Sequence, residues 1–238
     1  METNKKLLSR LTIRRDAVTP GRLHWMSYLL TIALVWPPSS AAFDTPLSDT
    51  AVREAYFLGQ RHDDSLGQLV NKYVQYLQAP KAGPYIESVS LLTPYVLTAI
   101  NSSEHVGIYS AQQAQIDHDK TPEIVRVTVQ IWLTDSYGPY TVRATSSDSH
   151  AVKGLVPRPD DFWRDFRLRI FQKDEMVLPV NAKGQPTYRC VEDACVLTGA
   201  TLHFEFPASA FTMDTVTIVV NPPEGEPVSV DFDPSSLR

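Results

Sequence analysis

Two side chains that could perform acid–base chemistry, His203 and Glu205, lie close together in the C-terminal part of the chain. The segment around them, 196–206, alternates apolar and polar residues, so both side chains would point to one face of a strand. There they could supply two metal ligands or an acid/base pair. The same alternation is typical of a solvent-exposed face, and the sequence places no third group beside them. We therefore treat the two as a candidate binding pair, and predict no catalytic residue, no metal site and no cofactor.

Four further side chains form a second candidate binding set. Arg126 and Trp132 fall on the polar side of one predicted strand, and Arg167 and Arg169 fall on the polar side of another. If these strands are neighbours, the four would form a basic and aromatic patch suited to an anionic sugar, a phosphate or an acidic protein surface. The alternative is that the arginines pair with Asp or Glu residues of adjacent strands.

Three other groups of acidic residues and histidines have structural interpretations. Residues 62–64 are suited to capping a helix, residues 117–119 to a polar turn, and residues 231–233 to the end of a strand. The sequence also lacks a Gly-rich phosphate loop, a dinucleotide fingerprint, and the HExxH and GxSxG motifs. These absences favour a protein without catalytic activity, although enzymes without such motifs exist.

The two cysteines, Cys190 and Cys195, are separated by four residues and flanked by segments with strand character. In an exported protein such a pair predicts a disulfide at the end of a hairpin. A thiolate metal site would need further Cys or His residues nearby, and a redox pair usually has two intervening residues ahead of a helix. We therefore predict a structural disulfide.

The first 42 residues have the organisation of a secretory signal peptide. Six basic residues precede an apolar run at 25–36, and Ser40 and Ala42 are placed for cleavage after Ala42. The alternatives are a retained N-terminal anchor and translation from Met26, which would leave no basic residue before the apolar run. We predict a periplasmic or extracellular protein that meets the membrane only through this segment.

Cleavage would leave an acidic protein. The first 42 residues hold 6 of the 22 basic and 2 of the 27 acidic residues, so the remaining 196 carry a net charge of −9. Because affinity for nucleic acid comes mainly from neutralised phosphates, we expect no nucleic-acid partner. The 43% hydrophobic and 21% charged residues are typical of a globular chain.

Hydrophobic periodicity predicts helices first and mainly strands thereafter. Apolar residues recur at helical spacing in 49–61 and 64–77, and a short helix is expected over 110–120. The expected strands are 85–100 with an interruption at Thr93–Pro94, 123–134, 140–145, 165–171, 176–180, the residues around Tyr188, 196–206, 215–220 and 228–232. Residues 146–161 are expected to form a long loop.

This pattern predicts a mainly β (α+β) fold: an antiparallel β-sandwich with a short N-terminal helical pair packed on it. The predicted organisation is a signal peptide at 1–42, an N-terminal helical segment at 43–83 and a β-sandwich-like domain at 84–238. Residues 43–48 are expected to form a mobile leader. A division into two sub-domains near residues 80–84 is the alternative.

Three segments, Arg53–Arg61 (REAYFLGQR), Gly83–Tyr95 (GPYIESVSLLTPY) and Tyr109–Ala114 (YSAQQA), resemble a group of uncharacterised exported bacterial proteins. This resemblance covers much of the chain after residue 42. It implies an exported location, and it implies no activity and no site residues.

These observations lead to one main expectation about function and two alternatives. The main expectation is an exported, non-catalytic binding or structural protein of the cell envelope, with a protein or glycan partner. The first alternative is an exported hydrolase with a site built from loops around His203 and Glu205. The second is an envelope assembly factor that pairs a strand edge with its partner.

Overall fold

The computed structural model describes residues 43–238, except for 106, 108, 145–152, 174 and 213–214. The predicted signal peptide at 1–42, and with it the predicted cleavage after Ala42, lies outside the described residues. Within the described ranges, no helix is both long enough and apolar enough to cross a membrane.

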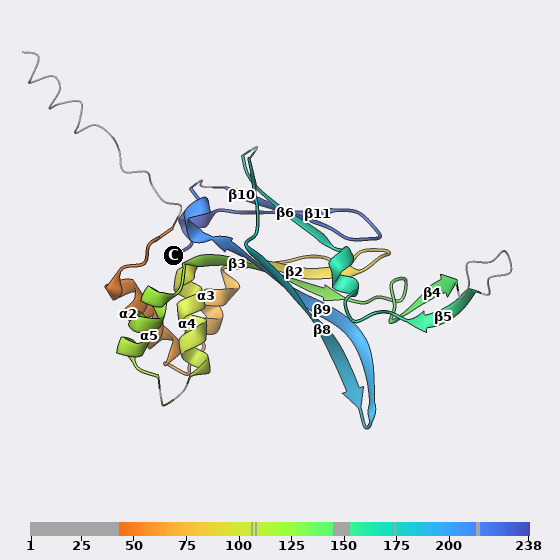
Figure 1. Cartoon of the computed structure of the whole chain (residues 1–238), viewed down its shortest axis with the longest axis horizontal. Helices are drawn as coiled ribbons and strands as arrows, with labels where there is room; N and C mark the ends of the chain where they lie inside the picture. The colour runs from red at the N-terminus through yellow and green to blue at the C-terminus, as the bar shows by residue number, and fades with distance from the viewer. Residues whose placement is uncertain (1–42, 106, 108, 145–152, 174, 213–214) are drawn as a thin grey trace, which may run out of the picture. The chain divides into compact units, whose positions relative to one another are not determined.

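Strands make up most of the regular structure. Their bounds are β1 Val74–Tyr76, β2 Tyr85–Leu92, β3 Ile124–Trp132, β4 Tyr140–Ala144, β5 Lys153–Pro157, β6 Arg167–Gln172, β7 Glu175–Val177, β8 Asn181–Val191, β9 Ala194–Pro207, β10 Val216–Asn221 and β11 Val228–Phe232. One sheet has the strand order β1-β2-β3-β9-β8, a second has β11-β10-β6-β7, and β4 and β5 form a separate ribbon (Figure 1). The pairings are antiparallel.

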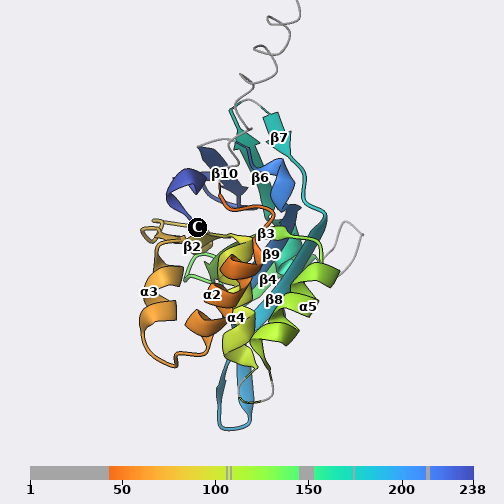
Figure 2. The same ribbon diagram turned by 90° about the vertical axis from the view of Figure 1, so that its left-hand side faces the viewer.

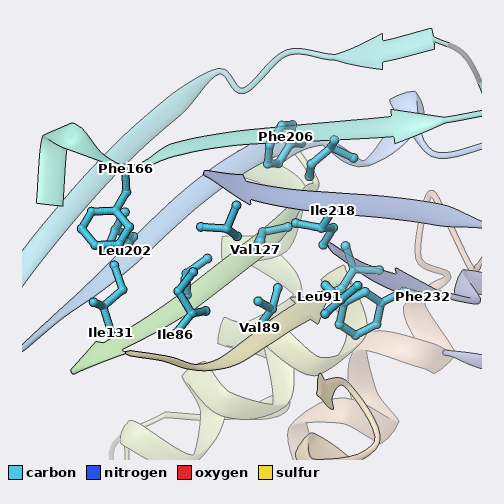
Figure 3. Close-up of a cluster of buried hydrophobic side chains, with 14 of the residues drawn as sticks. Ile86, Val89, Leu91, Val127, Ile131, Phe166, Leu202, Phe206, Ile218 and Phe232 are labelled. Carbon is cyan, nitrogen blue, oxygen red and sulfur yellow. The ribbon is translucent and has the colours of Figure 1, made fainter. Parts of the chain in front are cut away.

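The two larger sheets pack face to face over one apolar core (Figure 3). Strand β3 shows the reason: Val125, Val127, Val129 and Ile131 are all fully buried, and the residues between them face outward. Across the core these side chains meet residues of the second sheet such as Ile218. Burial of each side chain contributes roughly 1.5–3 kcal/mol. The predicted antiparallel sandwich is therefore confirmed.

The helices form a second apolar cluster beside the five-stranded sheet (Figure 2). Their bounds are α2 Asp49–Gly59, α3 Ser65–Asn71, α4 Pro94–Glu104 and α5 Ala111–Lys120. Helices α2 and α4 pack so closely that a Cβ atom on Gly59 would lie 2.2 Å from the Ala99 carbonyl oxygen. Ser48 and Ser110 cap α2 and α5 by accepting hydrogen bonds from backbone N–H groups of the first turn.

Two of the predicted elements are correct in type over their first part and wrong over their second part. The strand predicted over 85–100 ends at Leu92, and Pro94–Glu104 is helix α4. Thr93 and Pro94 are the N-cap and first residue of this helix, where proline is favoured, rather than an interruption in a strand. The helix predicted over 64–77 stops at Asn71, and Val74–Tyr76 forms β1, which pairs with β2 across the predicted boundary at residue 83.

Two predicted irregular segments are also more ordered than expected. The leader at 43–48 is held in place: Phe43 and Leu47 are each 6% exposed. Within the predicted loop at 146–161, Lys153–Pro157 is strand β5 and pairs with β4. The short strand expected around Tyr188 is part of a longer strand, the 11-residue β8.

Candidate functional site

The outer face of the five-stranded sheet carries a polar cluster of three predicted site residues. Arg126 of β3 and Glu205 of β9 are directly opposite in the strand register, and their side chains form an ion pair of 3.2 Å. Asn181 of β8 donates a second hydrogen bond of 2.9 Å to the other carboxylate oxygen. This hydrogen bond, together with the charge of Arg126, lowers the pKa of the Glu205 carboxyl. Glu205 is therefore held as an anion between two donors.

His203 lies on the same face and is half-buried. Its Nδ1 atom is 3.2 Å from the hydroxyl of Thr128, which lies directly opposite on β3. Burial, reinforced by the positive charge of Arg126, lowers the pKa of the imidazole. His203 is therefore a neutral, hydrogen-bonded side chain at neutral pH, and each member of the predicted pair has a structural partner of its own.

Trp132, at the end of β3, is also held by a specific contact. Its indole N–H donates a hydrogen bond of 2.7 Å to Glu87. Its ring packs over Gly199 of β9, where an added Cβ atom would approach the ring to 3.1 Å. The tryptophan thus stays half-buried on the outer face, at the opposite end of β3 from Arg126.

The predicted patch of four residues does not form. Arg167 and Arg169 lie on β6, which pairs with β10 and β7, and β3 pairs with β2 and β9. The two arginines therefore belong to the other sheet. Both are exposed, and Arg169 donates to the side chain of Asn221 at 3.4 Å. The condition for a joint basic and aromatic patch, neighbouring strands, is not met.

A pocket of about 420 Å³ opens beside Arg126, between α4, α5 and the start of β3. Leu97, Ile100 and Ile124 give it apolar walls, and Glu104 and Asp117 stand among its polar lining residues. The Nε atom of Arg126 is buried and has no hydrogen-bond partner within the described part of the chain. Chemically, the pocket offers an apolar surface beside charged groups, which suits a small amphipathic molecule.

Tyr109 and Glu123 are polar groups of this pocket that the sequence did not single out. Burial and the neighbouring Asp117 raise the pKa of the Tyr109 phenol to about 12. Glu123 accepts hydrogen bonds from the Thr45 hydroxyl at 2.5 Å and the Leu47 N–H at 2.6 Å, and pairs with His118 at 3.1 Å. Because Glu123 fixes the leader to α5 and β3, it is a structural residue.

Acidic residues of two other groups that the sequence analysis considered are held by local hydrogen bonds. Asp63 accepts a hydrogen bond of 2.9 Å from the N–H of Ser65 at the start of α3. Asp117 and Asp119 accept from Gln113 and Gln115 of the same helix, at 2.7 Å and 2.9 Å. Within the described ranges, no three His, Cys, Asp or Glu side chains form a group suited to a metal ion.

The cysteines form the predicted disulfide. Cys190 and Cys195 are directly opposite in the β8–β9 hairpin. The pairing of β3 with β9 ends at Gly199, so residues 188–197 form a two-stranded ribbon beyond the third strand (Figure 1). We call this ribbon the β8–β9 arm. A disulfide here is compatible with an oxidising, exported location.

Exposed apolar side chains are the feature of this surface that the sequence analysis did not identify. On the β8–β9 arm, Val191 is 62% exposed and Val196 is 46% exposed. Others lie on the β4–β5 ribbon and on the segment from β7 to β8: Tyr140, Val142, Leu155, Met176, Leu178 and Val180. The sequence signal is the pair of valines, Val191 and Val196, each directly beside a cysteine, at a predicted hairpin end closed by a disulfide.

Comparisons of the chain with protein-family models and with curated proteins find no match. Function must therefore be argued from the geometry of the surface itself.

Proposed function

We propose that this chain is an exported, non-catalytic binding protein that holds a partner protein through its β8–β9 arm. The observation that carries the proposal is the arm itself, a projecting ribbon fixed by a disulfide, with exposed valines on either side of its Glu192–Asp193 turn. Register places Val196 opposite Arg189 and Val191 opposite Ala194, so the two valines lie on the same face of the arm. A two-stranded ribbon is only marginally stable alone, and the disulfide compensates for the missing third strand.

Exposed valines favour a binding role over a purely structural one. Burial of a valine side chain stabilises a protein by roughly 1.5 kcal/mol relative to its exposure to water. A partner that covers an exposed valine would gain this contribution to its binding free energy. Two such side chains on one rigid face would supply a useful fraction of the binding free energy of a transient complex. The alternative of a hydrolase has less support, since Glu205 and His203 are already engaged by Arg126, Asn181 and Thr128.

Site-specific photo-cross-linking tests this function. A photoreactive amino acid would replace Val191 on the arm, Leu155 on the β4–β5 ribbon, or Lys81 in an exposed loop, and the protein would be expressed in its native host. We expect a discrete adduct with one partner protein at Val191, identified by mass spectrometry. An adduct at Leu155 alone, equal labelling from Lys81, or no adduct at any position would contradict the proposal.

A further inference from the structure

The edge of β8 that faces away from β9 is open. This strand of 11 residues ends the five-stranded sheet, and within the described ranges no strand pairs with its other side. Exposed edges are usually short, bulged, covered, or occupied by charged residues and proline, because their free N–H and C=O groups accept any extended chain. β8 carries Lys183, Pro186 and Arg189, so its edge would accept only a segment of matching charge. An open edge of this length is the element that proteins use to bind a partner by strand addition.

Pro186 indicates which backbone groups face the open edge. Proline has no N–H to give to a ladder, so within a paired strand its nitrogen points away from the neighbouring strand. Backbone direction alternates along a strand, so Ala182 and Gly184 also turn their N–H and C=O groups toward the open edge. A partner strand would form its hydrogen bonds to these two residues.

The two faces of β8 differ in chemistry. Lys183 and Arg189 are six residues apart, are both exposed, and alternate onto the outer face of the sheet. The inner face presents Ala182 and Gly184, and the ring of Trp163 packs so closely on Gly184 that an added Cβ atom would lie 2.1 Å from it. An added strand would therefore meet positive charge on one face and an apolar ring on the other.

Charge decides which occupant fits this edge. Lys183 and Arg189 are the charged residues of β8, and the sequence between them contains no Asp or Glu. The carboxylate of Asp160 contacts Tyr188, whose side chain lies on the other face of the strand. If the β8 strands of two copies paired antiparallel with the two Pro186 residues opposite each other, Lys183 of each copy would lie opposite Arg189 of the other. Like charges in opposed positions repel. The chain's own first 42 residues are basic and would be repelled too. The fitting occupant is an acidic segment of another protein.

We infer that the open edge of β8 binds an extended segment of the partner protein in which carboxylate and apolar side chains alternate, as a sixth and antiparallel strand of the sheet. The carboxylates lie over Lys183 and Arg189, and the apolar side chains lie toward Trp163. This inference rests on the proposed function and adds the chemistry of the partner.

A synthetic peptide tests this inference directly. The probe is acetyl-Glu-Val-Glu-Val-Glu-Val-Glu-amide, whose first and last carboxylates match the spacing of Lys183 and Arg189. We expect saturable binding by calorimetry and slower hydrogen exchange at the amide of Gly184, which pairs with the sixth residue of the peptide. A peptide with Lys in place of each Glu should bind at least about tenfold more weakly.

N-methylation separates strand addition from simple charge attraction. In antiparallel pairing, with the last glutamate of the peptide opposite Lys183, the valine N–H groups would face β8 and the glutamate N–H groups would face solvent. Methylating the second and sixth residues should abolish binding, and methylating the third and fifth should leave it unchanged. Equal binding of the acidic and basic peptides, or full binding of the valine-methylated peptide, would overturn the inference.

Protein variants give the complementary control. The double variant Lys183→Glu/Arg189→Glu should no longer bind the acidic peptide and should bind the basic one. The control variant Lys72→Glu/Lys81→Glu has the same change in net charge and should bind both peptides as the native protein does. If the photo-cross-link at Val191 persists while no peptide binds, the arm holds a partner without strand addition, and this inference alone fails. If both are absent, the proposed function fails as well.

Discussion

Arg126 on β3 and Glu205 on β9 occupy opposed positions of neighbouring strands, and their side chains meet at 3.2 Å. This pair is a cross-strand contact of the kind that stabilises a sheet. It explains how a strand face with alternating charged residues is compatible with a stable fold. It also makes the electrostatics of this face testable by pH.

Glu205→Gln should make the free energy of unfolding less dependent on pH in the acid range. The folded-state pKa of Glu205 lies below the ordinary value of 4.5, so its contribution is present above that value and is lost as the pH falls through the folded pKa. We expect the variant to be less stable than the native protein by about 1 kcal/mol at neutral pH. Urea unfolding should show this difference shrinking below about pH 4. The exposed Glu226→Gln serves as the control, and an unchanged difference at acid pH would contradict the assignment.

His203→Gln should act in a different pH window. The folded-state pKa of His203 is lowered from 6.5, so the unfolded chain takes up a proton first as the pH falls below that value, and the native protein loses stability. Glutamine keeps a polar group beside Thr128 and does not titrate. Unfolding midpoints at about pH 7.5 and about pH 5.5 should therefore move less in the variant than in the native protein. Identical shifts in the two proteins would show that His203 is not the responsible group.

Gly184→Ala should destabilise the sandwich because the new methyl group would overlap the ring of Trp163. We expect a loss of about 1–3 kcal/mol in the free energy of unfolding. Adding Trp163→Leu should make the glycine substitution less costly, since the obstructing ring is gone. Gly67→Ala in α3, with no atom within 4 Å of the added Cβ, is the matched control and should stabilise by up to about 1 kcal/mol. Equal effects at both glycines would contradict the packing argument.

The strands that could be predicted from the sequence are those whose two faces differ in chemistry. β3 is the clearest: its apolar residues are buried and its polar residues outward, so strict alternation located it. α4 could not be predicted in this way. Its residues Tyr95, Val96 and Ala99 are apolar because they pack into the helical cluster, and in the sequence this apolar run resembles the continuation of a buried strand. The isolated strand β1 depends on pairing with β2, which no local pattern records.

The candidate site depends even more on contacts between distant segments, which the sequence pattern does not record. His203 and Glu205 were correctly placed on one face of a strand, but their partners come from other strands: Arg126 is 79 residues away from Glu205 in sequence. The patch of four residues failed because sheet membership is a tertiary property that periodicity cannot assign. The open edge of β8 is likewise a consequence of strand order.

Replacing both cysteines by serine should loosen the β8–β9 arm and leave the core intact. A disulfide closing so short a loop contributes about 2 kcal/mol, mainly by restricting the unfolded chain. Because β3 does not reach residues 188–197, we expect hydrogen exchange to accelerate there and to stay slow in β3 and β10. The cross-link at position 191 should weaken in parallel. Uniformly faster exchange throughout the sandwich would show that the disulfide supports the whole fold.

Glu123→Gln should release the leader at 43–48. The carboxylate holds Thr45, Leu47 and His118 together, and an amide would weaken these charge-assisted hydrogen bonds. We expect a loss of about 1–2 kcal/mol in unfolding free energy and faster limited proteolysis within the leader. Glu104→Gln, an exposed residue of the same pocket, is the control and should change neither. If the leader stays protected in Glu123→Gln, burial of Phe43 and Leu47, rather than the carboxylate, holds it in place.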